Sequence, residues 1–139
     1  MGNERTLAII KPDAFGRGLA GEIIFRINKA GFQIVAIKSM HLTRKEAEGF
    51  YAVHRERGFF GELTEFMSSG KVVVLALDAE GAILKWRETM GATDPAKAAP
   101  GTIRRDLGTS IGNNCTHGSD APETAAFELG YFFAGYELI

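Results

Sequence analysis

A histidine followed by a glycine and two short polar residues, at positions 117–120, is the part of this sequence best suited to chemistry. His117 could be an ordinary packed ring, half of a Cys–His pair with Cys115, or a nucleophile that accepts a phosphate. The two members of a Cys–His pair would share one face of a strand. The sequence indicates no third group and no oxyanion hole beside them, so it gives a hydrolase of this kind little support.

The nucleophile hypothesis requires an acceptor that holds one ring nitrogen of His117 and leaves the other with its lone pair. Glu128 is the candidate acceptor. It stands eight residues beyond Asp120, about 12 Å along a helix, and His117 stands three residues before Asp120, about 10 Å along an extended chain. If residues 118 and 119 reverse the chain, the strand and the helix run antiparallel and the two side chains can meet.

A phosphate-binding site also needs positive charge and hydrogen-bond donors. The candidate cations are Lys11, Arg87, Arg104 and Arg105, and the candidate neutral donors are Tyr51, Thr93 and Asn114. Taken one at a time, such side chains are typical of a solvated surface. Phe59 and Phe60 follow a glycine, and they are either part of the core or a stacking platform for a base.

Residues 16–21 fit the pattern G-x-G-x-x-G between an expected strand and an expected helix. A dinucleotide site also needs a tight turn directly after the strand and an acidic residue at the end of the next strand. Here residues 12–15 separate the strand from the first glycine, and residues 39–42 (SMHL) contain no carboxylate. The motif therefore predicts a flexible turn, not a cofactor site.

The composition predicts one ordinary folded domain, residues 1–139, with a net charge of −1 and a pI near 6.3. That charge argues against a general nucleic-acid binder, which usually carries a basic excess. One cysteine cannot form an internal disulfide, and no apolar run approaches the roughly 18 residues of a membrane span. Without the apolar stretch of a signal peptide, a cytoplasmic location is expected. The first six residues also fit the short myristoylation pattern M-G-x-x-x-[ST].

The elements that must position these side chains follow from hydrophobic periodicity. Strands are expected at residues 6–11, 32–42 and 71–78, with a short fourth strand around His117. Five helices are expected. The first contains Ile23 to Ile27 and ends before Gly31, and the second starts at the capping box Thr43-x-x-Glu46 and carries Tyr51 and His54. The third contains Leu63 to Met67, the fourth contains Ile83 to Met90 and ends at Gly91, and the last runs from Ala121 to about Phe132, capped by Asp120-x-x-Glu123.

This order predicts an α+β fold of the ferredoxin-like βαββαβ type, with a four-stranded antiparallel sheet. The two helices between residues 43 and 70 form a helical-pair insertion. A long loop of residues 92–116, with little periodicity, precedes the last strand. Loops of this length inside a compact domain are usually functional or disordered.

With these elements in place, the sequence resembles the nucleoside diphosphate kinase family over essentially its whole length. The resemblance is carried by Asn114-x-x-His117-Gly118-Ser119-Asp120, by residues 5–13 (RTLAIIKPD), by Phe59-Phe60 and by residues 100–104 (PGTIR). It implies a subunit that moves the γ-phosphate of ATP, or of another nucleoside triphosphate, onto a nucleoside diphosphate. The implied route is ping-pong transfer through a pros-phosphohistidine at His117, with Mg²⁺ carried on the nucleotide phosphates and broad base specificity.

The resemblance also implies roles for individual side chains. Glu128 and Ser119 would orient the histidine, and His54 would lie at the mouth of the site. Phe59 would stack on the base, with Leu63 and Ile111 as apolar walls. The positions expected around the phosphates and the ribose are Lys11, which is also counted as catalytic, Tyr51, Arg87, Thr93, Arg104 and Asn114.

The sequence departs from the family pattern at two positions. Many relatives have arginine where this chain has Asn113, and many read Ile-Arg-Gly-Asp-Phe where this chain has Arg105 in the third place and Leu107 in the fifth. Neither departure touches a residue with an implied chemical role. The family forms homo-oligomers, tetramers or hexamers, and the loop with Pro95 lies at subunit contacts in it.

Two functions of other classes would also suit a ferredoxin-like fold. An RNA-binding module would display aromatic residues on its strands and a basic face, whereas these strands are aliphatic. A phosphohistidine relay protein would need the reactive histidine, but no base-stacking wall and no ribose contacts. Formation of a new triphosphate from ATP and a non-adenine diphosphate distinguishes a kinase from both.

Overall fold

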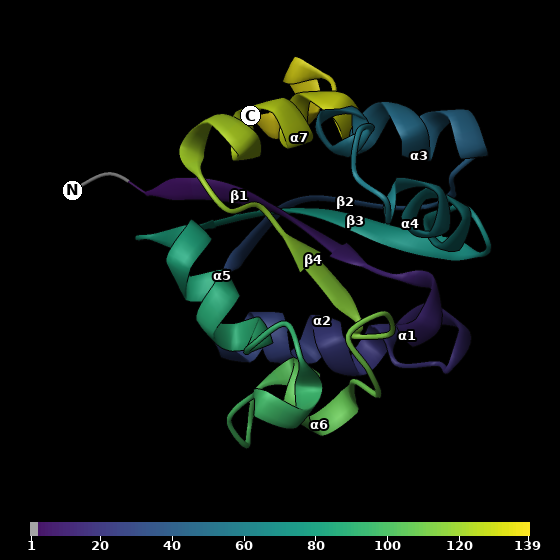
Figure 1. Ribbon diagram of the computed structural model, residues 1–139. Coiled ribbons are helices and arrows are strands. Elements are labelled where there is room, and N and C mark those ends of the chain that lie inside the picture. Colours follow the sequence, from purple (N-terminus) through teal and green to yellow (C-terminus); the bar gives the residue numbers. More distant parts are fainter. Residues whose placement is uncertain (1–2) are drawn as a thin grey trace.

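A four-stranded antiparallel sheet forms the centre of the protein in the computed structural model, which describes residues 3–139 (Figure 1). The strands are β1 (Glu4–Ile10), β2 (Gln33–His41), β3 (Lys71–Ala79) and β4 (Thr116–Gly118), and their order across the sheet is β2-β3-β1-β4. Every neighbouring pair is antiparallel. The predicted ferredoxin-like α+β fold is therefore confirmed.

Helices cover both faces of the sheet (Figure 1). One face carries α1 (Pro12–Gly16), α2 (Ala20–Lys29) and α5 (Ala82–Met90), with α6 (Ile103–Leu107) beyond them. The other face carries α3 (Arg44–Phe50), α4 (Phe60–Met67) and α7 (Pro122–Phe132). Three short 3₁₀ turns complete the described chain: η1 (Ala52–His54), η2 (Pro95–Lys97) and η3 (Gly135–Leu138).

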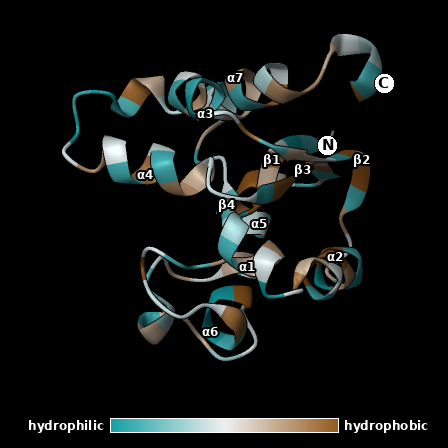
Figure 2. Ribbon diagram, turned by 90° about the vertical axis from the view of Figure 1, so that its right-hand side faces the viewer, coloured by the Kyte–Doolittle hydropathy of each residue, from teal (hydrophilic) through white to brown (hydrophobic). Residues whose placement is uncertain are grey.

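The two central strands are buried on both sides, which explains why they read as continuous apolar runs. Alternate residues of β1 point into opposite layers: Ala8 and Ile10 into the layer of α2 and α5, and Leu7 and Ile9 into the layer of α3 and α7. Figure 2 shows the same arrangement as hydrophobic strands between two helical layers. This packing fixes β1, and through it the strand beside it, β4.

Several local signals act as the sequence predicts. Thr43 and Glu46 form the reciprocal capping box at the start of α3. Gly31, after α2, and Gly91, the C-cap of α5, have φ of +95° and +88°. Side chains with a Cβ rarely adopt this left-handed region, so glycine allows the chain to leave each helix at these points.

Other expectations were wrong in detail. Asp120 does not cap α7: the N-cap is Ala121, no side chain caps the helix, and Pro122 starts it instead. His54 lies in η1 and not in α3, which ends at Phe50. The long loop contains the helix α6, which begins at the N-cap Thr102, whose hydroxyl accepts from the amide of Arg105.

Two remaining sequence features are the myristoylation pattern at the N-terminus and the apolar character of the helices. The myristoylation pattern begins with Met1 and Gly2, which lie outside the described residues. Among residues 3–139, none of the helices has both the length and the apolar character needed to cross a bilayer.

Candidate active site

His117 lies in the middle of β4, opposite Ile9 of the buried strand β1. Its carbonyl oxygen accepts a hydrogen bond from the indole nitrogen of Trp86 at 3.1 Å. A Cβ on the next residue, Gly118, would approach Cδ1 of Trp86 to 2.5 Å. Only glycine at position 118 therefore leaves room for the indole beside the strand. The backbone of His117 is held by its pairing with β1 and by the hydrogen bond from Trp86.

The imidazole of His117 meets the carboxylate of Glu128, which projects from α7. Nε2 of the ring lies 3.0 Å from Oε1 of Glu128, and Oγ of Ser119 donates to the same oxygen at 2.7 Å. Ser119 also accepts from the amide of Leu7 on β1, at 3.3 Å. Both Ser119 and Glu128 are buried, so this pair is fixed by the sheet and shielded from water.

The ring of His117 also packs against aromatic residues at the end of α3. The ring of Phe50 lies 5.4 Å from that of His117, and the ring of Tyr51 lies 6.1 Å away, both edge-on. Burial, and secondly the charge of Glu128, raises the pKa of Tyr51. Its hydroxyl therefore stays protonated at neutral pH, as a donor should.

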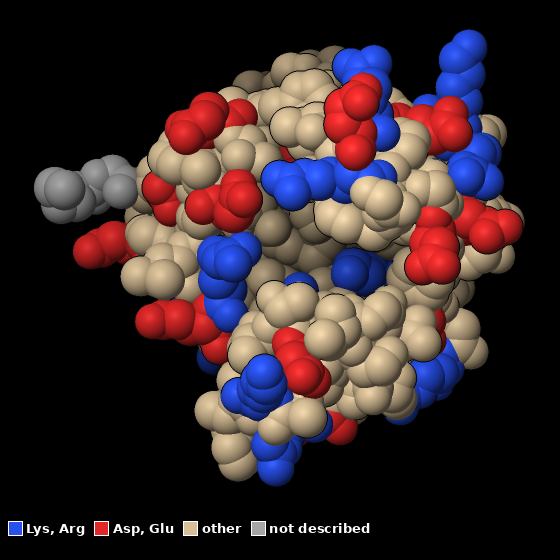
Figure 3. All heavy atoms as spheres, in the orientation of Figure 1, with Lys and Arg blue, Asp and Glu red and all other residues tan. Residues whose placement is uncertain are grey.

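A cavity of about 550 Å³ opens onto His117 and Glu128. Its walls come from η1 and α7, with Tyr51, His54 and Arg87 among the lining residues. Figure 3 shows the hollow on this face, with basic side chains at its rim and on its floor. A cavity of this size accommodates a small molecule with its reacting atom at the histidine.

A second cavity of about 390 Å³ is lined by Arg87, Thr93 and Arg104. Arg87 therefore lines this cavity as well as the one that contains His117. Arg104 is buried and donates to the carbonyls of Gly91 at 3.1 Å and Thr116 at 2.8 Å. Its Nε atom is buried without a partner among residues 3–139. Burial and the charge of Arg87 lower the pKa of Arg104 to about 10, which indicates a position where an anion would be stabilising.

Lys11, directly after β1, is tied to the same region. Its ammonium donates to Oδ1 of Asn114 at 2.9 Å, and the amide nitrogen of Asn114 donates to the carbonyl of Thr93 at 3.0 Å. Burial, followed by the charge of Arg104, lowers the pKa of Lys11 to about 8. Two cations thus share a partly dehydrated space, and a phosphate between them would relieve their repulsion.

The predicted base-binding residues are not gathered in the cavity that contains His117. Phe59 is 50 % exposed at the start of α4, and Leu63 follows one turn later, half-buried. Phe59 is connected to the cavity through His54, whose ring centroid lies 5.6 Å from that of Phe59. Ile111 is 60 % exposed in the loop after α6.

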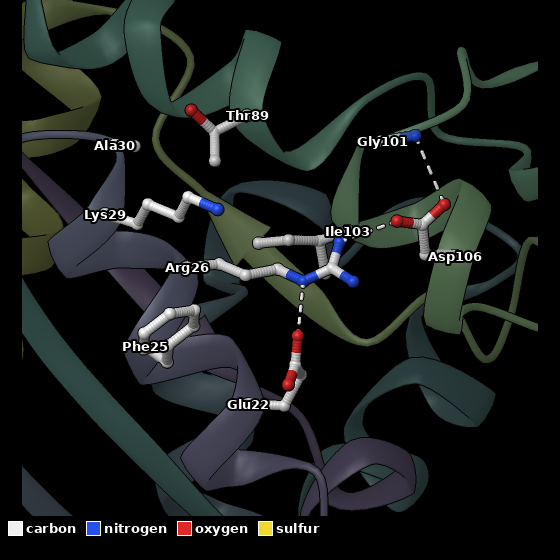
Figure 4. Close-up of a pocket in the computed structure, with 9 residues that line it drawn as sticks. All are labelled: Glu22, Phe25, Arg26, Lys29, Ala30, Thr89, Gly101, Ile103 and Asp106. Atoms are coloured by element: carbon white, nitrogen blue, oxygen red, sulfur yellow. Dashed lines mark hydrogen bonds and ion pairs between the residues drawn. The ribbon is translucent and has the colours of Figure 1, made fainter.

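A further cleft, of about 380 Å³, lies between α2 and α6, and one of its two cations, Arg26, is already paired. Figure 4 shows Arg26 between the carboxylates of Glu22 and Asp106, at 2.8 and 2.9 Å. Asp106 also accepts from the amide of Gly101. These contacts fasten the loop around α6 to α2, and they leave Arg26 little capacity for an added anion.

The Cys–His hypothesis fails on geometry. Cys115 precedes β4, has a positive φ and is buried in the layer of α2 and α5, so it does not share a strand face with His117. Burial and the nearby charge of Asp13 raise the pKa of its thiol to about 11. Neutral thiols are poor nucleophiles. Within residues 3–139, no group of three or more His, Cys, Asp and Glu side chains is arranged to hold a metal ion.

Two contributors to the site were missed by sequence reasoning. Trp86 reads as a core residue because it lies among apolar neighbours at helical spacing, and only its hydrogen bond to His117 reveals a second role. Asp13 reads as a turn residue after Pro12, whereas its carboxylate accepts from the amide of Cys115 at 3.1 Å. No local pattern could have indicated a contact across this sequence distance.

The sequence model of the family described as nucleoside diphosphate kinase matches residues 4–138. Nucleoside diphosphate kinases from Desulfotalea psychrophila and Syntrophotalea carbinolica are each 60 % identical over 136 residues, which is 98 % of this chain and 99 % of theirs. The enzyme of that name from Sorangium cellulosum is 59 % identical over 138 residues, covering 99 % of this chain and 96 % of its own.

Solved structures agree with these sequence matches. The nucleoside diphosphate kinase of Aquifex aeolicus superposes with a TM-score of 0.96 at 48 % identity, over 99 % of both chains. The halophilic enzyme of the same name from Halobacterium salinarum, solved in complex with CDP, superposes with a TM-score of 0.93 at 39 % identity. That alignment covers 99 % of this chain and 91 % of the other.

Proposed function

The chain belongs to the nucleoside diphosphate kinase family, whose members transfer phosphate between nucleotides, and from this premise we propose that His117 carries the phosphate. The observation that supports this proposal is the 3.0 Å contact between Nε2 of His117 and the carboxylate of Glu128. A carboxylate only accepts, so Nε2 carries the proton and Nδ1 keeps its lone pair. Nδ1, the pros nitrogen, is therefore the attacking atom.

The reaction consists of two transfers in opposite directions. In the first, Nδ1 bonds to the γ-phosphorus of a nucleoside triphosphate such as ATP, while the bond from that phosphorus to the bridging oxygen breaks and a diphosphate leaves. In the second, a terminal oxygen of another nucleoside diphosphate attacks the phosphorus, and the bond to Nδ1 breaks. The phosphorylated ring is cationic, and Glu128, supported by Ser119, stabilises that charge.

Phosphoryl transfer depends mainly on positioning and charge neutralisation. We assign these tasks to the cations Lys11, Arg87 and Arg104 and to the donors Tyr51, Thr93 and Asn114. Kinases of this family use a divalent cation, and we propose Mg²⁺, carried on the nucleotide phosphates. Mg²⁺ usually keeps several waters and binds phosphates with few protein carboxylates, which suits a site without an acidic cage in the described chain.

The base would lie outside the buried part of the site. We propose that it stacks on Phe59, with Leu63 and Ile111 as apolar walls and His54 bracing Phe59 from the cavity side. Stacking accepts any base because every base has a π-face. Broad base specificity is the consequence.

Labelling with ATP tests the nucleophile. Wild-type protein incubated with γ-labelled ATP should acquire an acid-labile, base-stable phosphate, and His117→Ala should abolish it. His41→Ala and His54→Ala serve as matched controls that remove the two other histidines and should still be labelled. Addition of a non-adenine diphosphate should then release the label as the new triphosphate. Label retained by His117→Ala would refute the assignment.

Three broader properties belong to the same proposal. We propose that residues 1–139 form a single domain, that the protein acts in the cytoplasm, and that it is a homo-oligomer of four or six subunits. Pro95 is buried beside Gly108 within the subunit. Light scattering should give the mass of four or six chains, and Pro95→Ser should lower thermal stability or promote dissociation. An active, stable monomer at micromolar concentration would contradict the oligomer.

A further inference from the structure

Asp13, in the first turn of α1, makes a contact that no step of the proposed reaction uses. Its Oδ2 atom accepts from the backbone amide of Cys115 at 3.1 Å, across 102 positions of sequence. Its Oδ1 atom is buried without a partner among residues 3–139. A carboxylate is rarely buried merely to satisfy one amide, so the amide it holds requires explanation.

Cys115 has a φ of +74°, and within residues 3–139 it is the one residue other than glycine with a positive φ. In this left-handed region the Cβ atom crowds the backbone carbonyl. Such a conformation persists only where the surrounding structure enforces it, and enforced conformations cluster at functional sites. The buried amide of Cys115 would lose its partner if φ relaxed to a negative value.

The left-handed conformation determines where the neighbouring side chain points. The carbonyl of Cys115 accepts from the amide of Lys11 at 2.8 Å, one residue beyond the last β1–β4 pair. The next residue of that edge is Pro12, which has no amide hydrogen to donate. The side chain of Asp13 supplies a partner for Cys115 at this point, and the chain turns so that Asn114 reaches both Lys11 and Thr93.

We propose that Asp13 is a positioning residue for phosphate transfer: by holding Cys115 in the left-handed conformation, it orients Asn114 and Lys11 toward the nucleotide. This inference rests on the proposed function, because Lys11 and Asn114 matter only if nucleotide phosphates and ribose lie beside them. Asp13 does not contact the reacting atoms itself. The pair of His117 and Glu128 is built by β4, Ser119 and α7, so it does not depend on Asp13.

Asp13 could instead act only through its charge on Lys11, and the two roles have different consequences. An amide at position 13 can still accept from the amide of Cys115, but it carries no charge. Glycine at position 115 adopts a positive φ without crowding, so it makes the acceptor dispensable. Serine at position 115 keeps the Cβ, and therefore keeps the need for Asp13.

The test is a double-mutant cycle on His117 phosphorylation, measured by rapid quench with γ-labelled ATP at several concentrations. Asp13→Ala should lower the second-order rate constant roughly 10- to 100-fold, the range expected for losing one hydrogen bond to a charged acceptor. Asp13→Asn should remain within about fivefold of wild type. In a Cys115→Gly background the Asp13→Ala loss should shrink to less than about threefold, whereas in the matched Cys115→Ser background it should stay near its full size.

Two readouts separate positioning from general damage. The half-saturating ATP concentration should rise in Asp13→Ala. The ¹⁵N chemical shifts of the His117 ring should match those of wild type, which would show that the tautomer is unchanged. If Asp13→Ala does not fold, the double variant with Cys115→Gly should recover folding and labelling, and failure to recover would refute the inference. A folded Asp13→Ala at the wild-type rate would also refute it. Equal losses in all backgrounds, with Asp13→Asn as slow as Asp13→Ala, would assign Asp13 to charge and overturn positioning.

The same experiment distinguishes a failure of the proposed function from a failure of the role proposed for Asp13. Wild-type protein that acquires no phosphate on His117 would overturn the proposed function, whatever the Asp13 variants do. Wild-type protein that is labelled at His117, together with an Asp13→Ala loss that Cys115→Gly does not relieve, would overturn the role of Asp13 alone.

Discussion

The two ends of the proposed nucleotide site differ sharply in how they are built. At the reaction end, Glu128 is buried and its oxygen accepts from both His117 and Ser119. At the base end, Phe59 and Ile111 are exposed, and the ring of Phe59 contacts the half-buried ring of His54. One end is a packed hydrogen-bonded unit, and the other is an open surface.

This difference corresponds to what each end must recognise. Phosphorus and its oxygens are the same in every nucleotide, so a rigid site that fixes one nitrogen atom serves all substrates. Bases differ in their hydrogen-bonding edges, and a buried polar site would reject those that leave a group unpaired. An exposed aromatic face avoids that selection. The comparison predicts that damage to the reaction end reduces rate, and that damage to the base end reduces affinity.

Removing the charge at Glu128 should have the largest effect. Glu128→Gln keeps the size but can present an amide donor to the histidine, so the phosphorylation rate should fall roughly 10- to 150-fold, as for a hydrogen bond to a charged group. Nucleotide affinity should hardly change, because the cations remain. Stopped-flow measurement across ATP concentrations separates the two terms. Glu80→Gln, which alters an exposed carboxylate after β3 that does not line the cavity with His117, is the control. A loss confined to binding would show that Glu128 has no chemical role.

Phe59→Ala, which removes the ring, should have a smaller effect, and that effect should fall on nucleotide affinity and not on rate. Base stacking contributes about 1–3 kcal/mol, and a half-exposed ring belongs at the low end, so affinity should fall roughly five- to twentyfold. The maximal phosphorylation rate should stay near that of wild type. Phe25→Ala, which removes a similarly exposed ring from α2, is the matched control. Losses that differ strongly among ATP, GTP and CTP would contradict base-independent stacking.

The pH dependence of binding should give a still smaller effect. The pKa of Lys11 is lowered to about 8 by burial and by Arg104, so the free protein loses this charge as pH rises through 8. Phosphate binding favours the charged form, and affinity for ADP should fall by up to about eightfold between pH 7.5 and 9. Lys11→Arg keeps its charge and should remove this dependence in calorimetric titrations. A wild-type affinity that stays constant over this range would show that Lys11 does not meet phosphate.

The same pKa has a consequence for stability with its own sign. Between about pH 8 and the ordinary lysine value of 10.5, the unfolded chain binds more protons at this position than the folded protein does. The contribution of Lys11 to the free energy of unfolding therefore increases with pH across that window. Below pH 8 the buried charge is destabilising, and bound phosphate should offset this. Denaturant titrations of wild type and Lys11→Arg, with and without ADP, measure both effects.

Much of the fold could be predicted from the sequence because its signals are local. The apolar runs of β1 and β3, the capping box at Thr43 and the glycines that end α2 and α5 each act within a few residues. Rise per residue was also enough to predict that His117 and Glu128 could meet, since only one reversal separates them. The start of α7 was predicted to within one residue, but its cap was wrong: Pro122 begins the helix after the N-cap Ala121, and Asp120 does not cap it.

The parts that could not be predicted depend on contacts between distant segments. The helix α6 is too short to show a period, and it is held by the bonds of Arg104 to Gly91 and Thr116. A positive φ is usually associated with glycine or asparagine, so nothing in the sequence indicates it at Cys115. The carboxylate that enforces it comes from Asp13, at the other end of the chain.

Replacing the thiol of Cys115 while keeping its Cβ should have the smallest effect. The thiol is buried, its pKa is raised to about 11 by burial and by Asp13, and it is therefore neutral and unreactive at neutral pH. Cys115→Ser keeps the left-handed conformation and the amide that Asp13 holds. Steady-state phosphotransfer should remain within about threefold of wild type, since only the poorer packing of a buried hydroxyl changes. Thermal unfolding, measured in parallel, should show a modest loss of stability. A loss of activity beyond roughly a hundredfold, about 2.7 kcal/mol, with the fold intact would mean that the thiol takes part in the chemistry. The thiol of Cys115 would then have to be included among the reacting groups beside His117.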